Sequence, residues 1–485
     1  MECFVNNLII NVLINYNNMK TSAVSVTRGL LVFLVLAAAV DARGQVGQIY
    51  ELTNYPKCDT SIIREWKEGL SLIYSRQPGS GNWFHLANSL GMTVASVKVG
   101  TDVKDMEIVD DTVYYCCMEP GSMYIGYFTI PDLLSSSMHE TLVKVYPPTL
   151  LDTIKEARPR RLEAFHMADG LHVIMLYDYE FVSGMVKRVL VDVYRLYSVP
   201  VWKAEHGAYN WDDSSSIFYG DDIAVTDNYV VLVGHKHYSS GIHARSFYKP
   251  TNSASNIFSS GSTLYNHLAY SGFAVLGDTY GDYPVWCTHT GDLRTRGNVV
   301  AIACMAPRSV GGSVEFGYTI KKYNAASPLS FSTQLFYPIS TTFNPLWKVR
   351  DIRYDALSNN LLVLHDADAP DGSLRSMVSV VDNSTYSTVE SYPNDKIHLH
   401  SMDKFNAWGD GVTSSSLNMV NGMFDWCIAK PVASPCFEVF PPTRALMGNG
   451  SGLDNTPVIP RSTPTLVLEN DYSVQTTPVN PLCKE

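Results

Sequence analysis

The chain has 485 residues, of which 46% are hydrophobic and 17% are charged, and its formal net charge is −11. This hydrophobic content is enough for a sizeable core and excludes a largely disordered chain. The negative net charge argues against nucleic acid or an anionic membrane surface as the main partner, since both require a basic face on the protein.

The N-terminal region predicts a secretory signal peptide. A short basic region precedes an apolar run over residues 29–40 and a small-residue exit at Ala42, which is the order of parts in such a peptide. The run is shorter than the about 20 apolar residues of a spanning helix. We expect residues 1–42 to be removed, with Met19 as the true start and no transmembrane span in what remains; an anchor that includes residues 8–13 is the alternative. The protein is then secreted or on the cell surface.

Eight cysteines follow residue 42, and an even number permits disulfide bonds in an exported protein. Buried free thiols are the alternative for each of them. Cys116 and Cys117 are adjacent in a strand-like run, so their side chains should point to opposite faces of a sheet. The candidate disulfide pairs are Cys427 with Cys436 and Cys287 with Cys304.

After the predicted signal peptide, short runs of Val, Ile, Tyr, Phe and Leu alternate with Gly, Asn, Asp and Pro, and helical periodicity is nearly absent. This pattern favours an all-β fold. One hairpin pattern recurs: residues 105–116 align without gaps on residues 222–233, and a looser copy begins at Asp351. Each copy predicts a strand, a tight Asp or Asn turn and a more apolar strand.

A second recurring element follows the hairpin, because residues 124–130 resemble residues 314–320. The hairpins lie about 50–70 residues apart, which is the size of a four-stranded propeller blade. We expect a β-propeller over residues 43–440, with six blades favoured and seven as the alternative if residues 82–99 begin a blade of their own. A pair of β-sandwich domains is the competing architecture. The six hairpin anchors are Asp105, Ala164, Asp222, Gly291, Asp351 and Ser401.

The composition changes near residue 440 to Pro, Thr, Ser and Asn. Such a composition is typical of an extended linker or tail. We expect residues 441–485 to be a tail of this kind.

The predicted signal peptide, the repeated hairpin at Asp105 and Asp222 and the strand around Gly126 together resemble uncharacterised secreted β-propeller repeat proteins of Gram-negative bacteria. The resemblance covers about residues 80–430 and implies a secreted propeller built of structural repeats; it supplies no catalytic residues. Several such proteins end in a sorting domain for export to the cell surface, and no typical sorting domain is recognised in this sequence.

Histidines give the sharpest metal-binding pattern. His235 and His237 are two apart in a strand-like run, where they share a face, and His243 follows closely. Neutral imidazole is a common zinc and copper ligand; an exposed polar strand face is the alternative. Three aspartates within residues 365–372 suggest calcium, but their spacing departs from the EF-hand pattern, which favours a solvated loop. We expect no cofactor, with Zn or Ca as the ions to consider.

Aromatic and acidic residues gather in two predicted loops. Aromatic faces stack on sugar rings and carboxylates accept hydroxyl protons, so these loops predict a rim that contacts a glycan or peptide. Packing between blades is the alternative for the aromatic residues. The rim candidates are Tyr209, Trp211, Asp212, Asp213, Asp278, Tyr280 and Tyr283.

The sequence contains no recognised catalytic motif, and we name no catalytic residue. The favoured interpretation is a non-enzymatic, exported propeller that binds a glycan, a peptide or a cell-surface partner. The alternative is a glycan-active hydrolase or lyase with carboxylates in the central channel, since a glycosidase needs only two carboxylates, which no linear motif reveals. A structural subunit of a surface assembly is a third hypothesis.

Overall fold

The computed structural model describes residues 49–483 with gaps, and it describes side chains within residues 60–388. The predicted signal peptide lies outside the described residues. Within the described residues, no helix is both long and apolar enough to cross a membrane. The longest gaps are residues 52–59, 208–217, 250–269, 276–284, 454–465 and 474–481.

Six sheets are each built from four strands that follow one another in the sequence and pair antiparallel. The strands of the first three sheets are β2 (Thr60–Glu65), β3 (Ser71–Gln77), β4 (Gly81–Ala87) and β5 (Thr93–Val99); β6 (Asp102–Val109), β7 (Thr112–Glu119), β8 (Ser122–Thr129) and β9 (His139–Val145); and β10 (Ile154–Met167), β11 (Gly170–Phe181), β12 (Val186–Leu196) and β13 (Trp202–Gly207). Those of the next three are β14 (Phe218–Val225), β15 (Tyr229–Lys236), β16 (Ser239–Tyr248) and β17 (Tyr270–Val275); β18 (Trp286–Thr290), β19 (Val299–Val310), β20 (Ser313–Asn324) and β21 (Phe331–Ser340); and β22 (Val349–Asp355), β23 (Asn360–Asp368), β24 (Leu374–Asp382) and β25 (Ser387–Pro393). A short helix, α3 (Ile130–Leu134), joins β8 to β9 and begins where the Thr129 side chain accepts a hydrogen bond from the Asp132 N–H.

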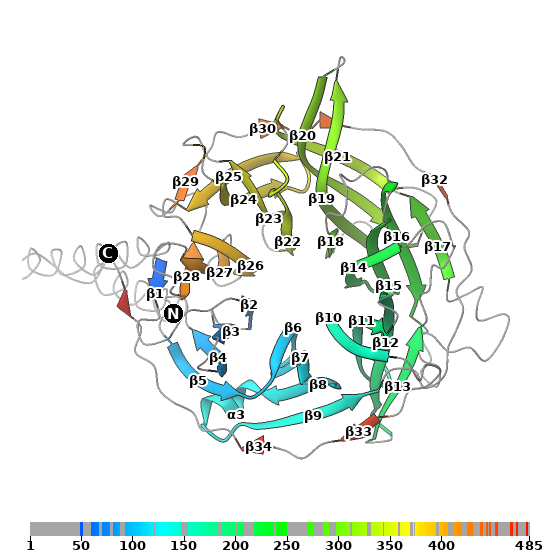
Figure 1. The fold of residues 1–485 in the computed structure, drawn as a ribbon, viewed down its shortest axis with the longest axis vertical. Helices are drawn as coiled ribbons and strands as arrows, with labels where there is room; N and C mark the ends of the chain where they lie inside the picture. Colours follow the sequence, from blue (N-terminus) through cyan, green and yellow to red (C-terminus); the bar gives the residue numbers. More distant parts are fainter. Residues whose placement is uncertain are drawn as a thin grey trace, which may run out of the picture. The chain divides into compact units, whose positions relative to one another are not determined.

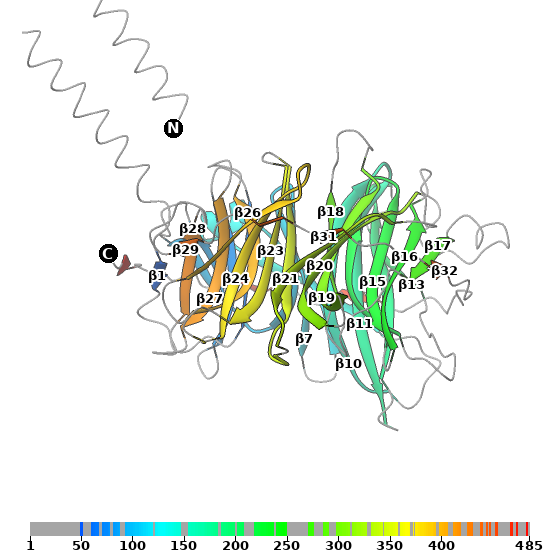
Figure 2. The same ribbon diagram turned by 90° about the horizontal axis from the view of Figure 1, so that it is seen from above.

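A seventh sheet joins the two ends of the described chain. It contains β26 (Ile397–Phe405), β27 (Gly411–Asn418) and β28 (Phe424–Ala429), and its next strand is β1 (Ile49–Glu51) from the N-terminal side. The innermost strand of every sheet contacts that of the next, and β26 contacts both β22 and β2. The sheets therefore close into a ring around a central axis (Figure 1), and in the edge view the strands run between the two faces of that ring (Figure 2).

The C-terminal residues add short strands to the outer edges of the sheets (Figure 1). They pair with β25, β21, β17, β9 and β1, each the fourth strand of its sheet. The region predicted as an extended tail thus contains edge strands, which cover main-chain groups that an open sheet edge would leave unpaired. These strands are β29 (Phe437–Val439), β30 (Thr443–Arg444), β31 (Leu446–Met447), β32 (Gly452–Leu453), β33 (Leu466–Leu468), β34 (Tyr472–Ser473) and β35 (Leu482–Cys483).

The β-propeller prediction is confirmed, and the repeated hairpins occupy equivalent places in it. Asp105 pairs with Cys116, Asp222 with Val233 and Asp351 with Leu364, each between the first two strands of a sheet. The six hairpins favour six blades, and six sheets each consist of four consecutive strands. Residues 82–99, on which the seven-blade alternative depends, form the second half of one of these sheets, together with β2 and β3.

A β-bulge precedes the anchor residue in several innermost strands. The register shifts directly before Asp105 in β6, before Asp222 in β14, before Asp351 in β22 and before Arg161 in β10. The anchor of the third sheet is therefore Arg161, three residues before the expected Ala164. A bulge inserts one extra residue, increases the local twist and redirects the next side chain. In this ring, the bulges place the anchor side chains where neighbouring innermost strands meet.

Apolar side chains between adjacent sheets form the core. Cys117 lies in a cluster with Phe84 and Val97, whereas Cys116 lies in a different cluster with Val173 and Val191. The prediction that Cys116 and Cys117 point to opposite faces of their sheet is therefore confirmed.

The predicted disulfide between Cys287 and Cys304 is wrong, because both are free, buried cysteines. Cys287 is in register with Ile302, so Cys304 is its diagonal neighbour. Diagonal neighbours lie about 7–8 Å apart, beyond the reach of a disulfide bond. Cys436 and the side chain of Cys427 lie outside the described residues, so that pair stays a prediction.

Each of the two third-strand segments contains a glycine with a packing role, although Gly126 is third in residues 124–130 and Gly317 is fourth in residues 314–320. A Cβ atom on Gly126 would overlap the Tyr115 ring, and one on Gly317 would overlap the main-chain oxygen of Tyr337. Tyr115 is fully buried and donates a hydrogen bond to Glu140. Each glycine thus makes room for a neighbouring strand.

Candidate functional site

The innermost strands surround a cavity of about 170 Å³ at the centre of the ring. Five cationic and four carboxylic side chains line it, together with Trp286 and Cys287 from β18. No single stretch of sequence supplies this set, since its members come from β2, β6, β10, β14 and β22. The charged lining residues are Arg64, Lys104, Asp105, Arg161, Glu163, Asp222, Arg350, Asp351 and Arg353.

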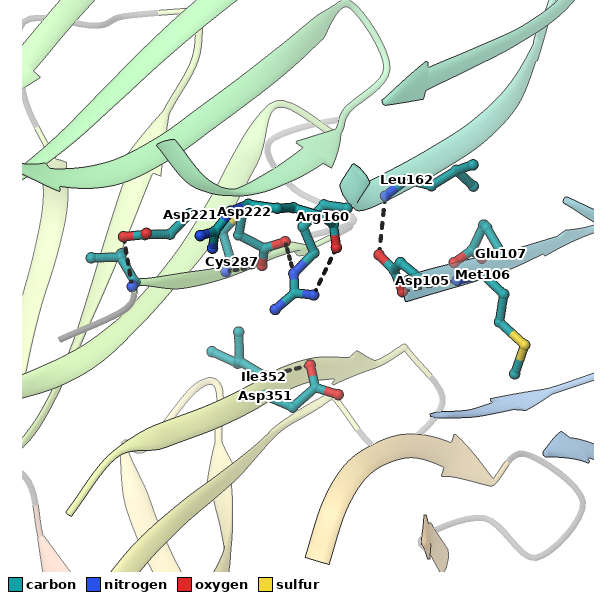
Figure 3. A network of polar contacts seen from close by, with 12 residues as sticks. Asp105, Met106, Glu107, Arg160, Leu162, Asp221, Asp222, Cys287, Asp351 and Ile352 are labelled. Atoms are coloured by element: carbon teal, nitrogen blue, oxygen red, sulfur yellow. Dashed lines mark hydrogen bonds and ion pairs between the residues drawn. The ribbon is translucent and has the colours of Figure 1, made fainter. Parts of the chain in front are cut away.

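Two of the carboxylates connect neighbouring sheets. Asp105 accepts a hydrogen bond from the Leu162 N–H of β10 at 3.0 Å, and Asp222 accepts one from the Cys287 N–H of β18 at 2.8 Å. Figure 3 shows both contacts around the channel. An innermost strand is a sheet edge with unpaired N–H groups, and these carboxylates satisfy them. Their first role is therefore structural.

Asp105 also binds the sheet on its other side. Arg64 of β2 donates to it from Nη2 at 2.9 Å, and the side chains of Arg64 and Asp105 are only 7% and 8% exposed. Arg64 further donates to the main-chain oxygen of Met106 at 2.9 Å. A single carboxylate thus links β2, β6 and β10, the innermost strands of three consecutive sheets.

Other cations of the lining are paired with acids outside it. Arg350 donates to both oxygens of the fully buried Asp366 at 2.8 and 3.0 Å, and Lys104 donates to Asp102 at 2.6 Å. Arg350 occupies the bulge directly before Asp351, and its partner Asp366 is on the second strand of the same sheet. These pairs hold their cations against the wall of the channel.

Arg161 is held differently. Its guanidinium group lies over the Trp286 ring at 4.1 Å from the centroid, and it donates to the main-chain oxygen of Arg160 at 3.0 Å. Its Nε atom is 3.4 Å from the nearest Asp222 oxygen, which is longer than the about 2.7–2.9 Å of a charge-assisted hydrogen bond. The stacking fixes the plane of the guanidinium group without using all of its donors.

Two of the carboxyl groups are shifted towards the protonated form. Burial raises the pKa of Glu163 well above its usual value, the nearby carboxylate of Glu107 raises that pKa further, and Arg353 opposes the shift. Burial also raises the pKa of Asp222 to about 7, against the effect of Arg161. Within the described part of the chain, the Glu163 carboxyl group makes no hydrogen bond. The raised pKa favours the protonated form of Glu163, which can donate a hydrogen bond.

The seven rim candidates, from Tyr209 to Asp213 and from Asp278 to Tyr283, lie outside the described residues. Their contact with a glycan or peptide stays a prediction.

The metal candidate His235 is buried, and its Nδ1 atom is 2.5 Å from the Asp221 carboxylate. Asp221 occupies the bulge before Asp222, so this pair repeats the bulge-to-second-strand contact of Arg350 with Asp366. His243 is in register with Gly234 rather than with His235. Within the described residues, no group of three metal-ligating side chains lies together. His237 and the His243 side chain lie outside them, so the metal site stays a prediction.

The acidic segment at residues 365–372 begins as a strand. His365 to Asp368 belong to β23, where Asp366 pairs with Arg350, and Asp368 accepts hydrogen bonds from Asn344 and Trp347. These two carboxylates are therefore occupied within the protein. The interpretation of this whole segment as one solvated loop is wrong for its first half, because the strand continues to Asp368.

Sequence analysis missed Arg161 and Glu163, although a signal for them exists. The anchor position and the one two residues later both carry charge in three innermost strands: Asp105 with Glu107, Arg161 with Glu163, and Asp351 with Arg353. Residues two apart share a face of a strand. Charged pairs at this spacing mark the channel face of these three strands.

The comparisons with known proteins concern the fold. No protein-family model matches the chain, and no curated protein matches it in sequence. Among solved structures, the chain is similar to the polysaccharide lyase Uly1, with 10% identity, 78% of this chain and 90% of that chain covered and a TM-score of 0.45. It is also similar to the α-L-arabinofuranosidase Arb93A from Fusarium graminearum in complex with an iminosugar inhibitor, with 12% identity, coverage of 71% and 99% and a TM-score of 0.43. Likeness at this level carries no argument, so the function proposed below rests on the cavity.

Proposed function

We propose that the protein is an exported binding module that takes a glycan in its central cavity. The observation that carries this proposal is the combination, in one cavity, of the Arg161 guanidinium group stacked on Trp286 and the Glu163 carboxyl group, whose raised pKa favours its protonated form. Ligand sites typically combine an aromatic wall with a few convergent polar groups. Sugars offer both a ring and hydroxyl groups to such a wall.

The size of the cavity limits the ligand. An engineered protein cavity of about 150 Å³ accommodates benzene, so the cavity of about 170 Å³ takes one six-membered ring. A terminal sugar residue of a longer chain fits this space, whereas several consecutive residues would have to extend from it. The rim loops predicted from the sequence would contact that extension.

The export part of the proposal rests on the sequence pattern of residues 19–42. N-terminal sequencing of the mature protein from its source would test it. A chain that begins just after Ala42 supports export with cleavage, and a chain that begins at Met1 or Met19 contradicts it.

A glycan array, combined with hydrolysis and elimination assays on the same sugars, tests the binding function. We expect the wild-type protein to bind one class of glycan without converting it, and the Arg161→Gln variant to lose that binding. Arg158→Gln is the matched control, since Arg158 is on the same strand but exposed and paired with Glu156 and Glu180. Equal binding by wild type and Arg161→Gln would contradict the proposal.

The second candidate is a glycan-active hydrolase or lyase, which the raised pKa of Glu163 favours. A carboxyl group kept neutral at working pH suits a general acid, and glycosidases pair it with an ionised carboxylate. Asp105 and Asp351 both accept main-chain hydrogen bonds, so each would have to combine that structural role with catalysis. Turnover that is lost in Glu163→Gln would favour this enzyme over the binding module.

A further inference from the structure

We propose that the cavity recognises an anionic group on its sugar ligand, with Arg161 pairing with that group and Glu163 donating a hydrogen bond to it. The inference deepens the proposed function and rests on it. The ligand class is a sugar that carries a carboxylate or a sulfate. The complex contains the proton of the Glu163 carboxyl group.

The position of Arg161 is the first argument. Trp286 holds the guanidinium plane at 4.1 Å, and the nearest carboxylate, Asp222, is 3.4 Å from Nε. Asp222 meanwhile accepts a hydrogen bond from the Cys287 N–H at 2.8 Å. The guanidinium group therefore keeps donors for another anion, and its planar fork matches a carboxylate or sulfate.

The second argument is the character of Glu163. It lines the same cavity and follows Arg161 by two residues on β10, so both side chains leave the same face of the strand. A protonated carboxyl group donates one hydrogen bond. An ionised Glu163 would instead repel an anionic ligand. Binding should therefore require that Glu163 keeps its proton.

The charges around Glu163 determine how the affinity for an anionic ligand depends on pH. Above the raised pKa of Glu163, each rise of one pH unit should weaken anion binding by about tenfold, because the complex must then take up one proton. Asp222, with a pKa of about 7, also ionises in this range, and burial keeps the nearby Cys287 thiol neutral by raising its pKa. The charged groups that act on Glu163 are Glu107, Arg353, Asp222 and Asp105. The other charged groups that line the same cavity are Arg64, Lys104, Arg161, Arg350 and Asp351.

Isothermal titration calorimetry tests the inference with D-glucuronate, D-glucose 6-sulfate and D-glucose at a series of pH values between 5.5 and 9. We expect either anionic sugar, or both, to bind more tightly than glucose, and their affinity to fall with rising pH in the wild type. Glu163→Gln should keep the affinity and lose the part of the pH dependence that Glu163 causes, while the Asp222 part remains. Arg161→Gln should weaken anion binding by about 10–100-fold, since a hydrogen bond to a charged group is lost.

Glu156→Gln is the matched control, because Glu156 is on the same strand outside the cavity lining. It should retain the wild-type pH profile, and thermal unfolding of each variant checks that it folds. Equal affinity for glucose and both anionic sugars, or a pH profile unchanged in Glu163→Gln, overturns the inference but leaves glycan binding intact. If no sugar on the array or in the calorimeter binds, the proposed function itself fails.

Discussion

The carboxylate of Asp105 should contribute strongly to the stability of the ring. It accepts hydrogen bonds from Arg64 Nη2 at 2.9 Å, from the Met106 N–H at 2.9 Å and from the Leu162 N–H at 3.0 Å. Asp105→Ala removes all three hydrogen bonds at once. It leaves the 7%-exposed Arg64 side chain with Glu107 as its remaining carboxylate, 3.5 Å away.

The cost follows from the burial of the groups left behind. Removing one partner of a buried ion pair destabilises a protein by about 3–5 kcal/mol, and Glu107 offsets part of this for Arg64. The Leu162 N–H adds about 1–3 kcal/mol if water does not reach it. We expect a loss of about 3–5 kcal/mol for Asp105→Ala. At an unfolding entropy of about 2.1 cal/mol/K per residue, this lowers the Tm of residues 47–485 by about 3–5 °C.

Thermal unfolding followed by circular dichroism measures this change. Asp105→Asn should fall between wild type and Asp105→Ala, because the amide oxygen still accepts one hydrogen bond. Asp110→Asn is the control: Asp110 is 79% exposed by its side chain and has a φ of 55°, a conformation that asparagine tolerates. If Asp105→Ala lowers Tm no more than Asp110→Asn does, the assignment of Asp105 as a link between sheets is refuted.

Three further predictions concern the sheets. Burial lowers the pKa of His85 to about 3, so its contribution to stability is present above pH 6.5 and is lost as pH falls from there; Tm measured from pH 6.5 to 4 should fall less in His85→Gln than in wild type. Gly126→Ala should lower stability by about 1–3 kcal/mol because its Cβ overlaps the Tyr115 ring, and unchanged denaturant unfolding would contradict this. Cys287 and Cys304 should resist thiol reagents in the native protein and react after unfolding without a reductant; a disulfide-linked peptide pair in a non-reducing digest would show the opposite.

The architecture was predictable because it repeats. The ungapped match of residues 105–116 to residues 222–233 reflects the same hairpin at the same place in two sheets. The Asp and Asn turns follow from local chemistry, since Asp110 and Asn359 both have positive φ values and these residues tolerate that conformation. Strand propensity and the spacing of hydrophobic residues are determined within one blade. The sequence therefore shows them once in each repeat.

The site was not predictable from those signals. Arg64 and Arg353 are far apart in the sequence and face one cavity only because the ring closes. In the sequence, the anchor aspartates indicate only the repeat. Their role as hydrogen-bond acceptors for the next sheet depends on β-bulges, which the hydrophobic pattern does not predict. The histidine motif suggested that His235 is a metal ligand. Its actual partner, Asp221, lies on the preceding strand and outside that motif.

The pairing of β1 with β28 sets the order in which the protein can be completed. Ile49–Glu51 leave the ribosome early, yet their partner strand Phe424–Ala429 is among the last to be translated. During synthesis, β1 therefore stays unpaired and the ring stays open until β28 has been made. Contacts at such sequence separation form slowly. A chain that ended before residue 424 would contain the four consecutive strands of six sheets but would lack the C-terminal edge strands, and its exposed seam would favour chaperone binding or edge-to-edge aggregation.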